Sequence, residues 1–170
     1  MIKISRKVGM AAVAFTLSVL LAVPAMAAYK ILIGVQTNYT QNDDLSGAFL
    51  ELDSSRRTSL TFSTGTKAST KIYINFKARC GVNGTSTSSF VSVVIYVDGV
   101  AVSPGGTDTA DFMCSTRDGL SGTATLFSDN NQQAFTTVGP GTHTVQVRAF
   151  LVNDATAWIL GLTTLLVASY

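Results

Sequence analysis

The segment TKIYINFKARC, residues 70–80, alternates between apolar and polar side chains at almost every position. Successive side chains of a β-strand point to opposite faces of its sheet. We expect one set of side chains to face a core: Ile72, Ile74, Phe76, Ala78 and Cys80. The pattern predicts a long strand with one buried face and one face in contact with solvent.

The chain after residue 27 is rich in Thr, Ser, Val and Gly and often repeats this period of two. Asp98-Gly99 lies between two β-branched runs and predicts a type I′ hairpin, because that turn needs a positive φ at both central residues. Other strands are expected over residues 29–36, 47–53, 58–63, 89–97, 100–103, 111–115, 122–128, 132–138, 142–152 and 156–170, the last with a bend or bulge at Gly161.

The number and spacing of these strands predict the fold class. Roughly ten short strands separated by Gly, Pro, Asn, Asp and Ser clusters are typical of all-β domains. We therefore expect an antiparallel two-sheet β-sandwich with jelly-roll-like connections.

Residues 1–27 have the layout of a secretory signal peptide. Lys3, Arg6 and Lys7 precede an apolar run over residues 8–23, and Ala25-Met26-Ala27 resembles a cleavage site. The run of about 16 residues is shorter than the ~20 residues of a membrane span. We expect removal after Ala27, rather than a retained anchor. The product would be a single secreted domain, residues 28–170, in the periplasm, on the cell surface or outside the cell.

Removal of the leader changes the charge balance. The leader holds three of the 12 Lys and Arg residues and none of the 10 Asp and Glu residues, so nine basic groups face ten acidic ones in the mature chain. A net charge near −1 gives no general attraction to nucleic acid or to an anionic membrane. We expect neither as a partner.

The two cysteines, Cys80 and Cys114, both lie in the exported part of the chain. An even number of cysteines in an oxidising compartment predicts one disulfide, with two free buried thiols as the alternative. The bridge would hold together the bases of two polar segments, residues 81–90 and 104–122. These segments are our candidates for recognition loops.

Catalytic groups are scarce. The single histidine, His143, alternates with Val145 and Val147 and is expected to be structural. No nucleophile elbow, zinc-protease motif or phosphate-binding loop is present, and Glu51 is the only glutamate. We expect no enzymatic activity, no cofactor and no metal site. Weak calcium binding at Asn42-Asp43-Asp44 or at Asp108 with Asp111 stays open.

The polar side of the strand over residues 70–80 is a candidate binding surface. It carries Lys71, Tyr73, Lys77 and Arg79, and Arg148 is expected on the outward side of the later strand over residues 142–152. If the two strands are neighbours, these residues form a cationic patch around Tyr73 for an acidic glycan or a partner's carboxylates. The alternative is a solvated face that only discourages edge pairing.

Three segments carry a resemblance to a known class of domains: VVIYVDGVAV (93–102), AFTTVGPGTHTVQVRAFLV (134–152) and the closing aliphatic strand. Together they resemble secreted bacterial or phage jelly rolls, which are similar to the globular heads of the tumour-necrosis-factor and complement type. The resemblance covers residues 58–170. It implies a jelly-roll fold, assembly (often as a trimer) and a binding role.

We expect a secreted, non-enzymatic interaction or structural module that binds a protein or glycan partner through its loops. One alternative is a fibre or pilus subunit, in which residues 28–40 would add a strand to a neighbour. Another is a carbohydrate-binding module with Tyr39, Tyr73 and Tyr96 as its exposed rings, because Trp158 is assigned to the core. A homo-oligomer also stays open.

Overall fold

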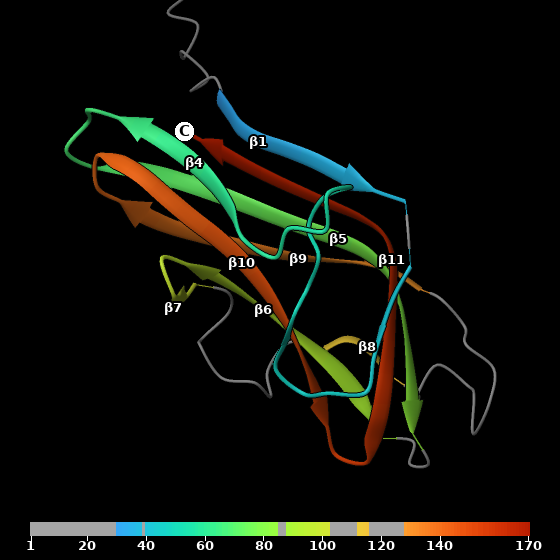
Figure 1. Ribbon diagram of the computed structural model, residues 1–170. Helices are drawn as coiled ribbons and strands as arrows, with labels where there is room; N and C mark the ends of the chain where they lie inside the picture. The colour runs from blue at the N-terminus through green and yellow to red at the C-terminus, as the bar shows by residue number, and fades with distance from the viewer. Residues whose placement is uncertain (1–29, 39, 85–87, 103–111, 116–127) are drawn as a thin grey trace, which may run out of the picture.

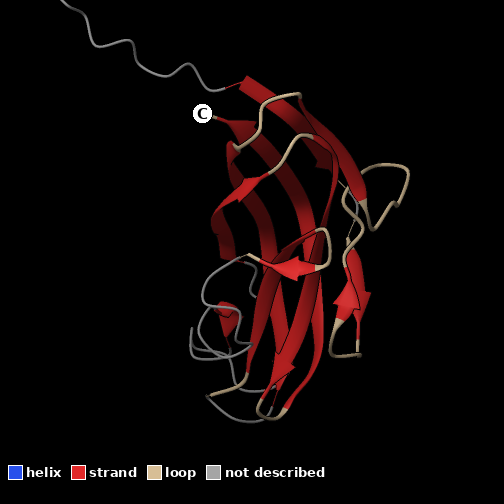
Figure 2. Cartoon of the chain, turned by 90° about the vertical axis from the view of Figure 1, so that its left-hand side faces the viewer, coloured by secondary structure: helices blue, strands red, loops and turns tan. Residues whose placement is uncertain are grey.

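The computed structural model describes residues 30–38, 40–84, 88–102, 112–115 and 128–170. The expected signal peptide and most of the expected strand over residues 122–128 lie outside these ranges. So do residues 104–111 and 116–122 of the second expected loop. The described residues form strands, turns and loops only, arranged in two layers (Figures 1 and 2).

One layer, here called sheet A, is antiparallel throughout. Its strand order is β1-β11-β5-β9, with β2 also pairing with β11. The strands are β1 (Lys30–Thr37), β2 (Gln41–Asp43), β5 (Thr70–Gly84), β9 (Ser128–Val138) and β11 (Ala155–Ser169).

The other layer, sheet B, is antiparallel too. Its order is β3-β10-β6-β7, while β4 also pairs with β10 and β8 with β6. The strands are β3 (Ala48–Phe49), β4 (Leu60–Gly65), β6 (Phe90–Val97), β7 (Val100–Ala101), β8 (Phe112–Ser115) and β10 (Gly141–Val152). The chain changes sheet between β2 and β3, β4 and β5, β5 and β6, β8 and β9, β9 and β10, and β10 and β11. The expected β-sandwich with jelly-roll-like connections is confirmed.

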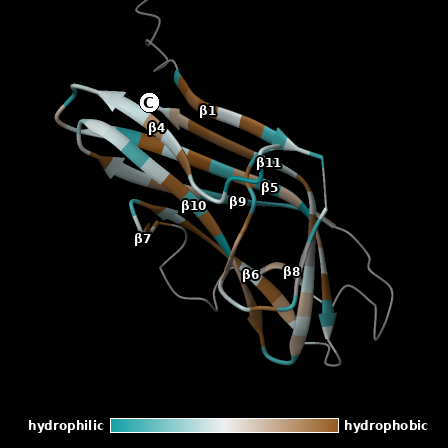
Figure 3. Cartoon of the chain, viewed as in Figure 1, coloured by the Kyte–Doolittle hydropathy of each residue, from teal (hydrophilic) through white to brown (hydrophobic). Residues whose placement is uncertain are grey.

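The alternation of β5 builds one side of the core. Its predicted inward residues, from Ile72 to Cys80, are completely buried and face buried residues of sheet B such as Val93 and Val147. Figure 3 shows the corresponding bands of apolar and polar residues along the strand. Trp158 is also buried, as expected, and its indole nitrogen donates a hydrogen bond to the carbonyl of Leu45 at 3.3 Å.

The predicted irregularity at Gly161 is a bulge in β11. Pairing with β5 shifts between Gly161 and Thr164, and Leu162 has a φ of 50°. The shift changes which residues face inward: Trp158 and Leu160 are buried before it, and Leu165 and Val167 after it. The bulge therefore lets both halves of one strand contribute to the same core.

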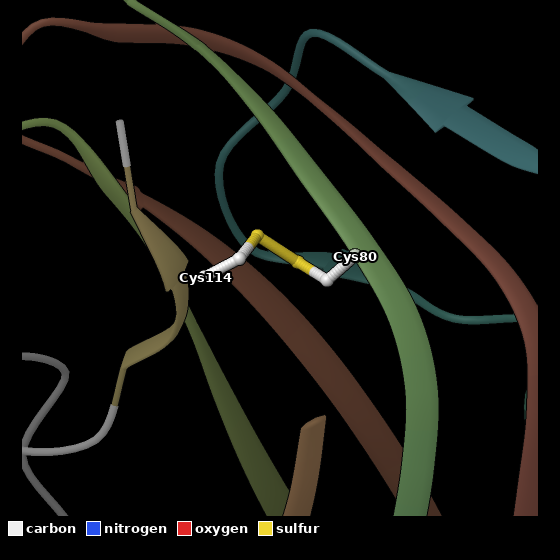
Figure 4. The surroundings of a disulfide bond; sticks show 2 residues. All are labelled: Cys80 and Cys114. Atoms are coloured by element: carbon white, nitrogen blue, oxygen red, sulfur yellow. A yellow bond between two sulfur atoms is a disulfide. The ribbon is translucent and has the colours of Figure 1, made fainter. Parts of the chain in front are cut away.

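The predicted disulfide joins the two layers. Cys80 on β5 of sheet A is bonded to Cys114 on β8 of sheet B, with 5.9 Å between their Cα atoms (Figure 4). Both cysteines are buried in the core. The bridge therefore ties the sheets together from inside.

The hairpin at Asp98-Gly99 has the predicted geometry. Asp98 has a φ of 50° and Gly99 a φ of 79°, as a type I′ turn requires. The strand that follows is short, because β7 contains only Val100 and Ala101.

Several expected boundaries are wrong, including the start of β9, which begins at Ser128 instead of residue 132. The strand predicted over residues 47–53 is reduced to β3, because the Asp53 carboxylate accepts hydrogen bonds from the backbone nitrogens of Ser55 and Arg57 and holds a turn there. The loop predicted from residue 81 begins later, because β5 continues to Gly84. A Cβ on Gly84 would lie 2.5 Å from that of Ser89, so this glycine serves close packing rather than a turn.

The N-terminal strand pairs within its own chain. β1 runs antiparallel to β11 from Lys30 opposite Ser169 to Thr37 opposite Thr163. Its backbone hydrogen bonds on that side are used within sheet A. The strand-addition alternative would require them to be broken.

Candidate functional site

The outward side of β5 has the predicted composition. Lys71, Lys77 and Arg79 are exposed and Tyr73 is half-buried on the outer face of sheet A. Arg148 does not join them, because β10 belongs to sheet B. The five-residue cationic patch required β5 and β10 to be neighbours, and they are not. Its candidate residues are divided between the two outer faces of the sandwich.

Arg148 makes a contact of its own on the outer face of sheet B. Its guanidinium carbon lies 3.8 Å from the ring centroid of Phe49 and 5.1 Å from that of Tyr96. Both distances are within the range of cation–π attraction. Its buried Nε has no hydrogen-bond partner in the described part of the chain. The charge of Arg148 thus helps to hold β3, β6 and β10 together.

Three aromatic rings meet on the outer face of sheet A, and we call them the aromatic platform: Tyr73, Phe135 and Tyr170. Tyr73 on β5 lies opposite Phe135 on β9, with 5.1 Å between the ring centroids. Tyr170, just after β11, meets Phe135 edge-on at 6.4 Å. Phe135 is 59% exposed and Tyr170 41% exposed. The platform is therefore an apolar patch with solvent access on the outer face of sheet A.

Polar groups surround the platform. The side-chain amide of Asn75 donates a hydrogen bond of 2.8 Å to the Tyr73 hydroxyl and fixes its position. Gln133 is exposed beside Phe135 and lies opposite Asn75 in the β5–β9 pairing. The ammonium nitrogen of Lys71 lies 6.0 Å from the centre of the Tyr170 ring. Amides and a cation thus border the three rings.

Sequence reasoning identified Tyr73 but missed Phe135 and Tyr170. A signal for Phe135 was present: in QQAFTTV it alternates with the polar residues Gln133 and Thr137, so an aromatic ring falls on the wet side of that strand. Of the other proposed rings, Tyr96 lies on the opposite outer face, in contact with Arg148. Tyr39 lies outside the described residues.

The hydrogen bonds of His143 link β10 to the turn at Asp98 and to Gly139. Its Nδ1 lies 2.7 Å from Asp98 Oδ2 and its Nε2 lies 3.1 Å from the carbonyl oxygen of Gly139. Both ring nitrogens face acceptors, which only the protonated imidazole satisfies completely. The hydrogen bond to Asp98 raises the pKa of His143 and outweighs the opposite effect of burial. Burial alone would raise the pKa of Asp98, but hydrogen bonds from His143 and Thr144 lower it.

Metal ligands do not gather in the part of the chain that the structure describes, where no three His, Cys, Asp or Glu side chains are grouped. The calcium candidates Asp108 and Asp111 lie outside the described residues, as do the side chains of Asn42 and Asp43. No described segment is a helix long and apolar enough to cross a membrane.

Comparisons with known proteins find distant likenesses only. No family model and no curated protein matches the chain. Among solved structures, it is similar to a family 35 carbohydrate binding module from Clostridium thermocellum, with 11% identity and a TM-score of 0.35, over 82% of this chain and 98% of that one. It is also similar to dimeric latent PorU from Porphyromonas gingivalis, with 9% identity and a TM-score of 0.38, over 84% of this chain and 13% of that one.

The likeness to heads of the tumour-necrosis-factor and complement type finds no support in the family or curated comparisons and stays a prediction. What this chain does must therefore be inferred from its own surface.

Proposed function

We propose that the chain is a secreted, non-enzymatic binding module that holds a glycan on the aromatic platform. The observation that carries this proposal is the contact of three rings on an outer sheet face, with Phe135 and Tyr170 both exposed. Aromatic side chains are more often buried, and an exposed group of them marks an interaction surface.

The chemistry of the platform fits a sugar. One face of a pyranose ring consists mainly of C–H groups, and these pack against the electron-rich face of an aromatic ring. The hydroxyl groups at the sugar's edge need hydrogen-bond partners, which the amides of Asn75 and Gln133 supply at the border of the rings. Tyr73 and Phe135 therefore provide stacking, and the amides provide orientation.

The platform is also rigid. β5 and β9 pair without a shift from Thr70 opposite Val138 to Cys80 opposite Ser128. Tyr73 and Phe135 project from the middle of this ladder. Side chains fixed before binding lose less conformational entropy when a ligand arrives. The sheet face thus meets one requirement of a binding site, and we propose it in place of the loops.

A protein partner fits less well than a glycan. A stable protein interface buries about 800 Å² on each side around an apolar centre. Here the three rings lie among polar residues, which include Lys71, Asn75 and Gln133. Strand addition is disfavoured for a different reason, since β1 already pairs with β11.

The test compares rings on the two outer faces. The mature protein is first screened on an array of neutral and acidic polysaccharides, and hexasaccharides of the retained class are then titrated by calorimetry. Phe135→Ala and Tyr73→Ala should each weaken binding about tenfold or more, a loss of about 1.4 kcal/mol. The matched controls Phe49→Ala and Tyr96→Ala, on the opposite face, should bind as the wild type does.

Two results would count against the proposal. One is that no polysaccharide on the array is retained by the folded protein. The other is that the platform variants bind normally while Phe49→Ala or Tyr96→Ala does not, which would assign the site to sheet B. Release of new reducing ends from a bound polysaccharide would contradict the non-enzymatic part.

A further inference from the structure

A cavity of about 670 Å³ lies next to the platform, where β1, β4, β5 and the end of β11 meet. Figure 1 shows the C-terminal end of the chain beside the tip of β4 and the beginning of β1. The volume is within the range of about 300–1,000 Å³ that is common for ligand pockets. We call it the lysine pocket, because Lys30, Lys67 and Lys71 line it.

The charged side chains that line the lysine pocket in the described part of the chain are all positive. Its lysines come from three places: β1, the turn between β4 and β5, and β5 itself. The lining found in the described part of the chain includes no Asp or Glu, and its other polar side chains are mainly Ser and Thr hydroxyls. Like charges placed around one hollow repel each other, and an anion bound between them would offset that repulsion.

The wall of the pocket also contains a hydroxyl with no hydrogen-bond partner. Thr70 is 7% exposed, and its Oγ1 is buried without a hydrogen-bond partner in the described part of the chain. Buried polar groups in folded proteins are almost always hydrogen-bonded. An oxygen-rich ligand in the pocket would give this hydroxyl a partner after a rotation about the Thr70 side-chain bond.

The lysine pocket and the platform share one residue. Tyr170 belongs to the platform and also lines the pocket, and its backbone nitrogen donates a hydrogen bond of 3.2 Å to the carbonyl of Lys71. The Lys71 ammonium lies near the same ring. A saccharide chain stacked on Phe135 therefore has the pocket directly beside its next unit.

We infer that the module selects acidic glycans. This inference rests on the proposed function: one sugar stacks on the platform, and the carboxylate or sulfate of a neighbouring sugar enters the lysine pocket. Lysine suits this role, since its ammonium is a compact charge that can donate several hydrogen bonds to an oxyanion. Because attraction of this kind is screened by salt, the preference for acidic chains should be greatest at low ionic strength.

The experiment titrates three hexasaccharides into the mature protein: a galacturonate hexamer, a sulfated galactan hexamer and a neutral galactan hexamer. At about 50 mM salt, one or both acidic hexamers should bind about tenfold or more tighter than the neutral one, and the advantage should shrink at about 300 mM salt. The acidic hexamer that binds more tightly identifies the source of the oxyanion.

Variants of single lysines locate the effect. Lys67→Gln and Lys30→Gln should each weaken acidic hexamers several-fold and leave the neutral hexamer unchanged. Lys77→Gln is the matched control, because it removes the same charge from the outer face of β5 outside the pocket. Its binding of all three hexamers should equal that of the wild type, and unchanged melting temperatures should show that the variants fold.

Free galacturonate separates this inference from the proposed function. Binding of the monomer that Lys67→Gln weakens and Phe135→Ala leaves unchanged would support the lysine pocket even if no hexamer binds. Equal affinity for acidic and neutral hexamers, or equal weakening by Lys67→Gln and Lys77→Gln, would overturn the acidic preference and leave the platform standing.

Discussion

The two outer faces of the sandwich use the same kinds of side chain in opposite ways. On sheet A, Phe135 contacts both Tyr73 and Tyr170, and the Lys71 ammonium lies 6.0 Å from the centre of the Tyr170 ring. On sheet B, Arg148 lies against the rings of Phe49 and Tyr96. Lys71 lies at the outer limit of a cation–π contact with one ring, whereas Arg148 lies closer and covers the Phe49 ring within the protein.

Strand register explains the difference. In the β5–β9 pair, Tyr73 lies directly opposite Phe135, so the two rings meet each other. In the β3–β10 pair, Arg148 lies directly opposite Phe49, so the cation meets the ring. Directly opposed residues are the closest side-chain neighbours in a sheet. Register thus pairs a ring with a ring on one face and a ring with a cation on the other.

The strongest way to break this comparison is to remove the bridge between the sheets. The Cys80–Cys114 bond links residues 34 apart in the sequence, and both ends are buried. The double variant Cys80→Ala, Cys114→Ala should lower the free energy of unfolding by roughly 3–4 kcal/mol and affect both faces alike. Guanidinium denaturation measures the loss. A change below about 1 kcal/mol would mean that the core alone holds the sheets together.

A smaller effect should distinguish the cations of the two faces. Arg148→Ala removes a guanidinium and a hydrocarbon stem packed on two rings, and should lower the free energy of unfolding by about 1–2 kcal/mol. Lys71→Ala, on an exposed side chain, should change it by no more than about 0.5 kcal/mol. Urea denaturation of both variants tests the difference. Equal losses would show that the two faces are not organised differently.

The smallest effect concerns pH and should belong to the sheet B side, where His143 and Asp98 lie. Because the pKa of His143 is raised in the folded protein, its contribution to stability is complete below the usual pKa of 6.5. That contribution is lost as pH rises through the pKa of the folded state. Because the pKa of Asp98 is lowered in the folded protein, its contribution to stability is complete above the usual pKa of 3.8. That contribution is lost as pH falls through the pKa of the folded state.

Stability should therefore be higher near pH 5 than near pH 9 by no more than about 1 kcal/mol, because the Asp98 side chain is 47% exposed and solvent weakens the pair. Denaturation of the wild type and of His143→Gln at both pH values measures this. In His143→Gln, the free energy of unfolding should fall much less between pH 5 and pH 9 than in the wild type. An identical decline in both proteins would assign it to other groups.

Local patterns predicted the strands and their faces because those properties depend on near neighbours in sequence. The buried set from Ile72 to Cys80 follows from alternation, and the turn at Asp98-Gly99 follows from the backbone freedom of its residues. Glycine misled the interpretation once: Gly84 permits close packing against Ser89 inside a strand, and sequence alone does not distinguish this role from a turn.

The candidate site was predicted only in part because it depends on which strands become neighbours. Tyr73 and Lys71 lie on one strand, so their shared face could be inferred. Phe135 comes from β9 and Tyr170 from the end of β11, and only the strand order and register bring them to Tyr73. Arg148 lies on the opposite face for the same reason, because β10 belongs to sheet B.

The bulge in β11 has a practical consequence for labelling. Leu162 lies in the middle of a central strand, yet it is 39% exposed, while Leu160 and Thr163 beside it are buried. A cysteine at this position would carry a fluorophore or spin label outside the core, at the centre of sheet A. Such a probe could follow the mobility of that sheet during unfolding without replacing any interior side chain.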